Sequence, residues 1–176
     1  MAELERERVR ERGPREKSPY EALYQSREEF QERQRTGKVV IRREDREFEI
    51  SRQGKLLWYV QPFAYNDTCL MDWLFFIQDI PKHSGRHRHQ GGLAIFVVEG
   101  KGYTVVDGVQ YDWEAGDLIL LPVKENGVEH QHFNREPGKP CLWLAMINIP
   151  IWEWGAADMR QGTELSPEWL SQQGQL

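Results

Sequence analysis

Two segments of the sequence, GRHRHQGGLAIFVVEGKGYTVVDG at residues 85–108 and GDLILLPVKENGVEHQHFN at residues 116–134, carry most of the information about the fold. They contain four of the five histidines of this 176-residue chain, and the fifth lies just before the first segment. Imidazole is the commonest metal-ligating side chain, so this clustering indicates a metal site. Because side chains alternate between the faces of a strand, His87 and His89 are expected side by side, with Arg88 on the opposite face.

From Val39 onward the sequence consists of short runs rich in Val, Ile, Trp, Tyr and Phe, separated by turns that often contain glycine. Such runs are typical of strands, and many short strands joined by glycine-rich turns favour a β-sandwich or a barrel. The sequence therefore predicts an all-β barrel over residues 38–160. The predicted strands are residues 56–63, 70–80, 93–100, 102–108, 109–114, 117–123, 129–134 and 141–149.

A helix signature lies at each end of this strand-rich region. Ser18-Pro19-Tyr20-Glu21 combines an N-cap serine, proline at the first helical position and glutamate three residues after the cap, which predicts a helix over residues 18–37. Ser166-Pro167-Glu168-Trp169 repeats the N-cap serine and the first-position proline, with glutamate in the first turn, and predicts a short helix within the C-terminal tail, residues 161–176. The first helix has a narrow apolar stripe that we expect to dock on the domain or on a second subunit, as a homodimer. The stripe consists of Tyr20, Leu23, Tyr24 and Phe30.

Composition makes several partners improbable. The formal net charge is −5, and basic residues alternate with acidic ones, so no basic surface for nucleic acid is expected. Residues 1–17 alternate Glu and Arg and are expected to form a charged, flexible tail without the apolar core of a secretion signal. The apolar runs are too short to span a bilayer. We therefore expect a cytoplasmic protein, no membrane partner, and reduced thiols at Cys69 and Cys141.

The two histidine segments resemble the two motifs of the cupin superfamily. The first family motif runs His-x-His, three or four residues, glutamate and then a glycine turn, and its counterpart here begins at His87-Arg88-His89 and ends at Gly100. The second runs glycine, proline, glycine and His-x-x-x-Asn. Its counterparts are Gly116, Pro122, Gly127, His130 and Asn134. This resemblance covers the middle third of the chain and implies a cupin jelly-roll barrel with a metal ion held by His87, His89 and His130.

The chain departs from the common motif at the ligand glutamate, where it has Leu93, or Ala94 with the longer spacing. This feature is similar to the gentisate 1,2-dioxygenase branch of three-histidine iron cupins. The resemblance implies Fe(II), O2 and cleavage of a carbon–carbon bond in a hydroxylated aromatic acid or a β-diketone. Nickel, manganese, zinc and copper remain alternatives, because nitrogen ligands do not select iron. Three neutral imidazoles leave the charge of the ion uncompensated, which favours a small anionic, chelating substrate.

Four further interpretations concern the surroundings of the ion. His132 shares strand parity with His130 and is hypothesised to assist proton transfer, its ordinary pKa being near ~6.5, or only to orient a ligand. Arg86 is expected to meet a substrate carboxylate, and Gln90 to hydrogen-bond a ligand or bound oxygen. Two or three aromatic residues are expected to line the cavity. The candidates are Trp58, Tyr59, Trp73, Phe75, Phe96, Trp143, Trp152 and Trp154.

Two other classes of function are compatible with the same sequence. A divalent ion could serve a lyase, decarboxylase or isomerase that needs no O2, by polarising a carbonyl and stabilising an enolate. A single cupin could also be a non-enzymatic module that binds a small molecule. Loss of substrate without O2 would distinguish the first alternative, and ligand retention without turnover the second.

Overall fold

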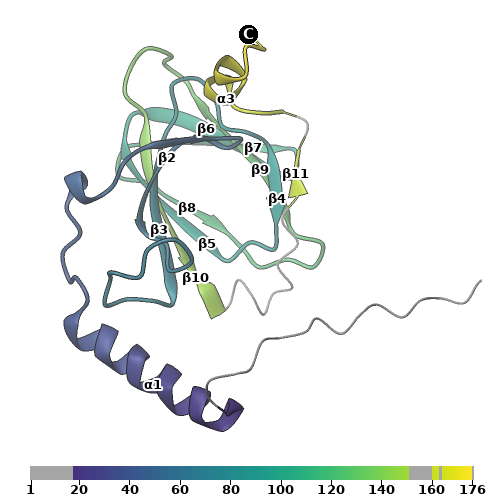
Figure 1. Cartoon of the computed structure of the whole chain (residues 1–176). Coiled ribbons are helices and arrows are strands. Elements are labelled where there is room, and N and C mark those ends of the chain that lie inside the picture. The colour runs from purple at the N-terminus through teal and green to yellow at the C-terminus, as the bar shows by residue number, and fades with distance from the viewer. Residues whose placement is uncertain (1–17, 151–159, 163, 176) are drawn as a thin grey trace, which may run out of the picture.

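The computed structural model describes residues 18–150, 160–162 and 164–175. Two antiparallel sheets enclose the interior (Figure 1), one in the strand order β1-β2-β3-β10-β5-β8 and the other in the order β11-β4-β9-β6-β7. The predicted all-β architecture is confirmed. The strands are β1 (Glu49–Ser51), β2 (Gly54–Val60), β3 (Trp73–Asp79), β4 (His87–His89), β5 (Leu93–Glu99), β6 (Lys101–Val106), β7 (Val109–Glu114), β8 (Leu118–Leu121), β9 (Val128–Asn134), β10 (Leu142–Asn148) and β11 (Arg160–Gln161).

All eight strands predicted by residue range are present, and β4 is the strand that the alternation of His87 and His89 implied, but two further short strands, β1 and β11, were not predicted. β1 pairs with β2 through the register Glu49↔Leu56, and β11 pairs with β4 through Gln161↔His87. Both are short and rich in polar residues, so they lack the apolar alternation by which a strand is recognised in a sequence. Their position comes from backbone hydrogen bonds to a neighbouring strand. The short helix η1 (Arg43–Asp45) precedes β1.

The core lies between the sheets and follows the alternation of side chains along each strand. On β5, Leu93, Ile95 and Val97 are buried, whereas Phe96 between them is 41% exposed. On β10, Trp143 and Ala145 are buried in the same way. The β5–β10 register pairs Val97 with Trp143 and Ile95 with Ala145, so the two inward rows face the same interior. This interior is the one that the histidines enter.

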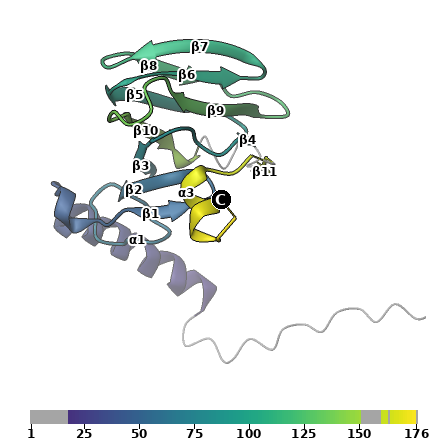
Figure 2. The ribbon, with the colours of Figure 1, turned by 90° about the horizontal axis from the view of Figure 1, so that it is seen from above.

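The first predicted helix is confirmed as α1 (Pro19–Thr36), with the Glu21 N–H donating to the Ser18 side chain at 3.2 Å. Its apolar stripe, however, does not pack on its own barrel. No residue of α1 is buried, and Leu23 and Tyr24 are 60% and 53% exposed. Figure 2 shows α1 at the side of the molecule beyond β1 and β2. Docking on the chain's own domain is therefore wrong, and docking on a second subunit stays a prediction.

The C-terminal helix is also confirmed, as α3 (Pro167–Gln172). The Ser166 hydroxyl accepts from the Trp169 N–H at 3.3 Å and donates to the Ser51 carbonyl at 3.2 Å, so the cap also attaches the helix to β1. Residues 1–17 lie outside the described residues. Within the described part of the chain, no helix is long and apolar enough to cross a membrane.

Both cysteines are free thiols, as predicted. Cys141 is fully buried, and desolvation raises the pKa of its thiol to about 12. A thiol with such a pKa stays protonated at neutral pH and is chemically inert. Cys69 is only half-buried.

Asn134 connects the end of β9 to the chain on both sides of it. Its buried amide donates to the carbonyls of Ile80 at 3.0 Å and Lys139 at 3.1 Å, and its side-chain oxygen accepts from the Glu136 N–H at 2.8 Å. No aliphatic residue could supply both a donor and an acceptor here.

Replacement of Asn134 by alanine should destabilise the fold by about 2 kcal/mol, because it leaves buried backbone groups without partners. Chemical denaturation of Asn134→Ala would measure this loss, and Asn66→Ala, at an exposed asparagine, is the matched control with an expected change below about 0.5 kcal/mol. Equal stability of the two variants would contradict the role assigned to the amide.

Candidate metal centre

Three histidines converge because β4 pairs with β9 in one particular register. His87 lies directly opposite His130 in this antiparallel pair, and His89 is on the same face of β4 two residues later. The ring centroids are 4.1 Å apart for His87 and His130, and 4.8 Å apart for His89 and His130. One candidate ligand atom from each of the three lies within 4.8 Å of the others. The predicted trio is therefore brought together, with a geometry that could hold an ion.

The hydrogen bonds of two of these rings fit a cation. His130 Nδ1 lies 3.1 Å from the Val128 carbonyl, to which it can only donate, so the neutral ring has its lone pair on Nε2. That Nε2 is buried and has no hydrogen-bond partner. His87 Nδ1 is similarly directed at the Gly85 carbonyl, at 3.4 Å. A buried lone pair without a donor is costly, and a metal ion at this point would satisfy it.

His89 is held differently. The Gly91 N–H donates to His89 Nδ1 at 3.0 Å, so the neutral ring has its proton on Nε2. An ion at Nε2 would require the other tautomer and the release of the Gly91 hydrogen bond. The backbone of Gly91 has φ +89°, and a Cβ there would overlap the Pro122 carbonyl, so only glycine permits this turn beside the ligand.

Burial keeps all of the clustered imidazoles neutral. Desolvation, followed by the proximity of other histidines, lowers the pKa of His87 and that of His132 to about 3 each, and desolvation lowers the pKa of His89 to about 4. The pKa of His130 lies well below its ordinary value for the same two reasons. Neutral imidazole is the form that binds metals, so at neutral pH no proton has to be displaced from a charged ring, although His89 would still have to change its tautomer.

The structure decides which residue stands at the position of the missing glutamate. Leu93 is 6% exposed, points inward on β5 and lines the same cavity as the three histidines. Ala94 is on the outward side of the strand, where its register partner is Leu120. No carboxylate is among the described residues that line the cavity. The centre is therefore a neutral three-histidine group beside an aliphatic side chain.

A cavity of about 270 Å³ extends from the histidines toward β2 and β3. Of the aromatic candidates, Trp58 and Trp143 line it, and Tyr59, Trp73, Phe75 and Phe96 do not. Trp152 and Trp154 lie outside the described residues. The remaining lining residues are Gln53, Leu56, Gln61, Phe63, Leu74, Phe76, Gln78, His87, His89, Leu93, His130, His132 and Ile147. Sequence reasoning missed Phe63 and Phe76, although the inward parity of Phe76 with Leu74 on β3 could have indicated it.

His132 enters the cavity next to the trio, as its parity with His130 predicts. Its Nδ1 lies 2.8 Å from the Thr104 hydroxyl, which accepts from the Trp113 indole N–H at 2.9 Å. Since indole can only donate, all three groups are satisfied when the hydroxyl donates to Nδ1. The neutral ring then has its proton on Nε2. His132 therefore presents an N–H donor, and with a pKa of about 3 it is a poor proton acceptor, contrary to the ordinary value that the sequence hypothesis used.

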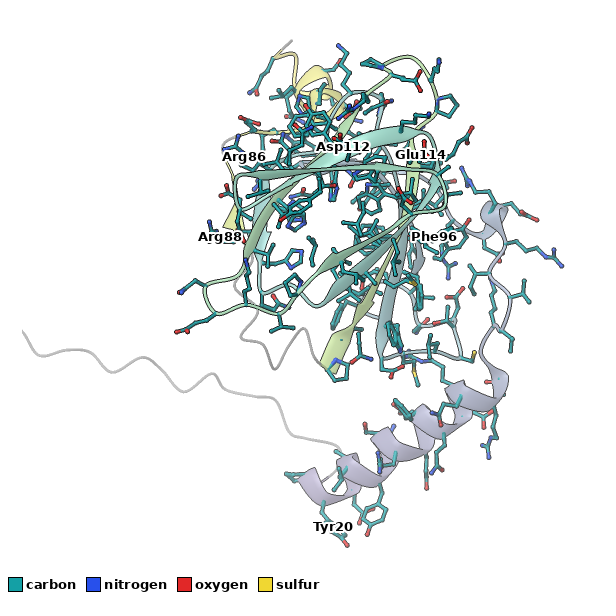
Figure 3. All side chains as sticks on the ribbon, turned by 180° about the vertical axis from the view of Figure 1, so that it is seen from behind. Tyr20, Arg86, Arg88, Phe96, Asp112 and Glu114 are labelled. Atoms are coloured by element: carbon teal, nitrogen blue, oxygen red, sulfur yellow. The ribbon has the colours of Figure 1, made fainter. Side chains whose placement is uncertain are left out.

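The two predicted substrate-binding residues do not line the cavity within the described part of the chain. Arg86 donates to Glu164 at 2.7 Å in a half-exposed ion pair, and Figure 3 shows it at the periphery of the barrel. The side chain of Gln90 is buried, and the backbone carbonyl of this residue accepts from the Lys124 N–H. Arg88 points away from the histidines toward Glu129, as strand alternation predicted. His83 lies near Gln131, outside the metal group.

Comparison with known proteins agrees with this geometry. Residues 76–147 match the model of the cupin domain. The chain contains a cupin domain. The predicted cupin with three clustered histidines is thereby confirmed, together with its distant relationship to gentisate 1,2-dioxygenases. Over 66 residues the chain is 41% identical to a gentisate 1,2-dioxygenase from Streptomyces sp, and over 55 residues it is 40% identical to a 5-aminosalicylate 1,2-dioxygenase from Comamonas sp.

These relationships cover only part of each relative. The matched segment is 37% of this chain but 17% of the Streptomyces enzyme, and 31% of this chain but 14% of the Comamonas enzyme. Among solved structures, a salicylate 1,2-dioxygenase variant from Pseudoaminobacter salicylatoxidans in complex with gentisate matches 82% of this chain and 37% of its own, with TM-score 0.52 and 23% identity. The polyketide cyclase RemF from Streptomyces resistomycificus matches 77% and 93%, with TM-score 0.54 and 19% identity. At these identities the structures support the cupin fold alone.

Thr104→Val should change the tautomer of His132, because it removes the hydroxyl that donates to Nδ1. In the wild-type cupin we expect a ¹⁵N–¹H correlation spectrum of the histidine rings to place the proton of His132 on Nε2, and in the variant a mixture of tautomers. Ser84→Ala is the control: it removes a buried hydroxyl that accepts from the backbone N–H of His132 but not from its ring, and it should leave the ring signals of His132 in the wild-type pattern. An Nδ1–H tautomer in the wild type would contradict the assignment.

The metal-free protein should lose stability as the pH falls from about 6.5 to about 4. In this range the unfolded chain protonates its histidines, whereas His87, His89 and His132 in the folded chain do not, so protons favour unfolding. We expect the free energy of unfolding to fall by more than about 1 kcal/mol across this range, measured by denaturant titration after chelation. In the folded chain the pKa values of the Asp67 and Asp107 carboxyls are lowered from 3.8. Their protonation therefore changes the stability mainly at pH values below this range. A flat profile would contradict the burial of neutral imidazoles.

Proposed function

We propose that this protein is a metal-dependent cupin dioxygenase that cleaves a carbon–carbon bond in a small, chelating substrate, with Fe(II) held by His87, His89 and His130. The observation that carries the proposal is the convergence of three neutral imidazoles without a carboxylate. Such a ligand set leaves the charge of a divalent ion uncompensated and leaves positions for other ligands. The partial similarity to gentisate and 5-aminosalicylate 1,2-dioxygenases supports the same class of chemistry.

The lining of the cavity favours a substrate that binds mainly through the ion. Neither lysine nor arginine is among the described residues that line it, so the positive charge facing a ligand would be that of the ion. Most of the lining is aliphatic or aromatic, and a volume of about 270 Å³ suits one ring or a short dicarbonyl chain. A 1,3-dicarbonyl enolate or a hydroxylated aromatic acid, each able to chelate an ion through two oxygens, fits this environment.

The metal, the aromatic residues of the cavity and His132 would have different roles. Iron, when bound, would supply the activation of O2 and the Lewis acidity that favours the ionised form of the substrate. Trp58, Phe76 and Trp143 would hold the apolar part of the substrate and exclude water. His132 would donate a hydrogen bond from Nε2 to an oxygen of the substrate as negative charge develops there. Because this ring is a donor, its proposed role is to stabilise charge.

The proposal is tested by metal analysis combined with an oxygen-electrode screen of hydroxybenzoates and β-diketones. We expect about one iron per chain after reconstitution, and oxygen consumption that matches substrate loss. His130→Ala should lose most of the metal, because it removes a ligand whose Nε2 has no other partner. His83→Ala, outside the trio, is the matched control and should retain the metal.

Two outcomes would contradict the proposal. Substrate loss that continues without O2 would favour a lyase, decarboxylase or isomerase. Full metal occupancy in His130→Ala would show that the ligand assignment is wrong.

A further inference from the structure

One end of the histidine cavity is lined by a glutamine that is almost completely buried. Gln78 on β3 is 3% exposed and faces the cavity together with Leu74 and Phe76 of the same strand. Most of the other lining residues are aliphatic or aromatic. A buried carboxamide is costly unless both its NH2 group and its oxygen have partners, so the partners of Gln78 indicate what this end of the cavity can bind.

The NH2 group of Gln78 has its partner within the protein. It donates to the backbone carbonyl of Gln53 at 2.6 Å, in the turn between β1 and β2. Because a carbonyl can only accept, this bond fixes which end of the amide is the NH2 group. Gly54 leaves space for it, since an added Cβ there would lie 2.8 Å from Gln78 Nε2. The side-chain oxygen of Gln78 has no donor among the described residues and is left as an acceptor.

The residue opposite Gln78 supplies a donor. Trp143 lies directly across from Gln78 in the β3–β10 register, and the side chains of such a pair are on the same side of the sheet. The ring of Trp143 lines the cavity, and its buried indole N–H has no hydrogen-bond partner among the described residues. The ring centroids of Trp143 and His132 are 4.9 Å apart, so the glutamine and the tryptophan lie beside the histidine group.

An acceptor and a donor on neighbouring strands are complementary to one kind of ligand group. No aspartate, glutamate, lysine or arginine is among the described residues of the lining. A carboxylate placed here would meet the oxygen of Gln78 without a cation to compensate it, and a methyl group would leave both the acceptor and the donor unsatisfied. A hydroxyl group has a hydrogen to donate and lone pairs to accept, so it satisfies Gln78 and Trp143 together.

We propose that Gln78 and Trp143 form a subsite for a hydroxyl group of the substrate, remote from the oxygens that chelate the ion. Gln78 accepts from this hydroxyl through Oε1, and Trp143 donates to it through Nε1, which makes Gln78 a specificity-determining residue. The inference rests on the proposed function, because it concerns the ligand that chelates an ion in this cavity. It narrows the substrate to a small chelating anion with a second, uncharged hydroxyl, in preference to one with a second carboxylate or an entirely apolar end.

Isothermal titration calorimetry of the zinc-loaded protein tests the subsite independently of turnover, because zinc binds imidazole and is redox-inactive. The probes are salicylates that carry a hydroxyl, methyl or carboxylate group at ring carbon 4 or 5 and keep the chelating carboxylate and phenol oxygens. At the ring position that binds more tightly, we expect the hydroxyl derivative to bind at least about tenfold more tightly than the methyl derivative. The carboxylate derivative should bind most weakly.

Gln78→Met shows whether this residue recognises the hydroxyl, because it replaces the amide by a thioether of similar length that is a much weaker acceptor. The preference for hydroxyl over methyl should fall below about threefold, and Trp143→Phe should lower it in the same direction. If Gln78 only held the turn at Gln53, its replacement would weaken both derivatives alike and leave their ratio unchanged.

Gln131→Met is the matched control for this substitution. Gln131 is also buried, and its NH2 group also donates to a backbone carbonyl, that of Ser84 at 2.9 Å, but its side chain does not line the cavity. The variant should keep the wild-type preference for the hydroxyl derivative.

Several results would overturn the subsite and leave the proposed function in place. They are equal binding of the hydroxyl and methyl derivatives to the wild type, tighter binding of the carboxylate derivative, an unchanged ratio in Gln78→Met, and an equal loss of preference in Gln131→Met. Failure of all the salicylates to bind would also overturn the subsite. If acetylacetone, a β-diketone probe, failed to bind the zinc-loaded protein as well, the chelating substrate of the proposed function would be contradicted with it.

Discussion

The antiparallel pairing of β4 with β9 is the interaction on which the candidate site depends. It places His87 opposite His130, and the inward parity of both strands adds His89 and His132 to the same interior. A slip of one residue would turn every one of these side chains to the other side of the sheet. The register is held from outside the pair as well, because β9 also pairs with β6, and Asn134 joins its end to the carbonyls of Ile80 and Lys139. The histidine group is thus a consequence of strand geometry.

The cavity contains imidazoles of two kinds, and their neighbours decide the difference. His130 has a backbone carbonyl at Nδ1, which leaves a lone pair at Nε2, whereas His132 has the Thr104 hydroxyl at Nδ1, which leaves a proton at Nε2. His130 can therefore offer a lone pair to a metal ion, and His132 can donate a hydrogen bond. The β6–β9 register pairs Thr104 with His132, so the same backbone alignment that collects the rings also sets their tautomers. Burial then keeps the imidazoles neutral, because it disfavours their protonation, and the neutral form is the one that binds a metal ion.

The larger sheet separates two apolar environments with different uses. On its inner side, Leu93, Trp143 and Ile147 line the cavity, and on its outer side Phe96 and Leu120 are left exposed. A sheet with both sides apolar is normally covered on both. Among the described residues, the apolar side of the helix α1 is exposed as well, and it does not pack on its own barrel.

The sequence by itself determined the elements that depend on local pattern. Alternation and glycine turns predicted eight strands, the Ser-Pro signatures at residues 18–21 and 166–169 predicted both helices, and the two histidine motifs predicted the trio and the inward position of His132. Only the tertiary structure decided matters that depend on neighbours distant in the chain. In the structure Leu93, and not Ala94, lies at the position of the missing glutamate, and Arg86 pairs with Glu164 away from the cavity. The structure also contains β1 and β11, which have little apolar alternation. It also revealed the donor form of His132, because a tautomer depends on a partner 28 residues away that becomes adjacent only when β6 and β9 pair.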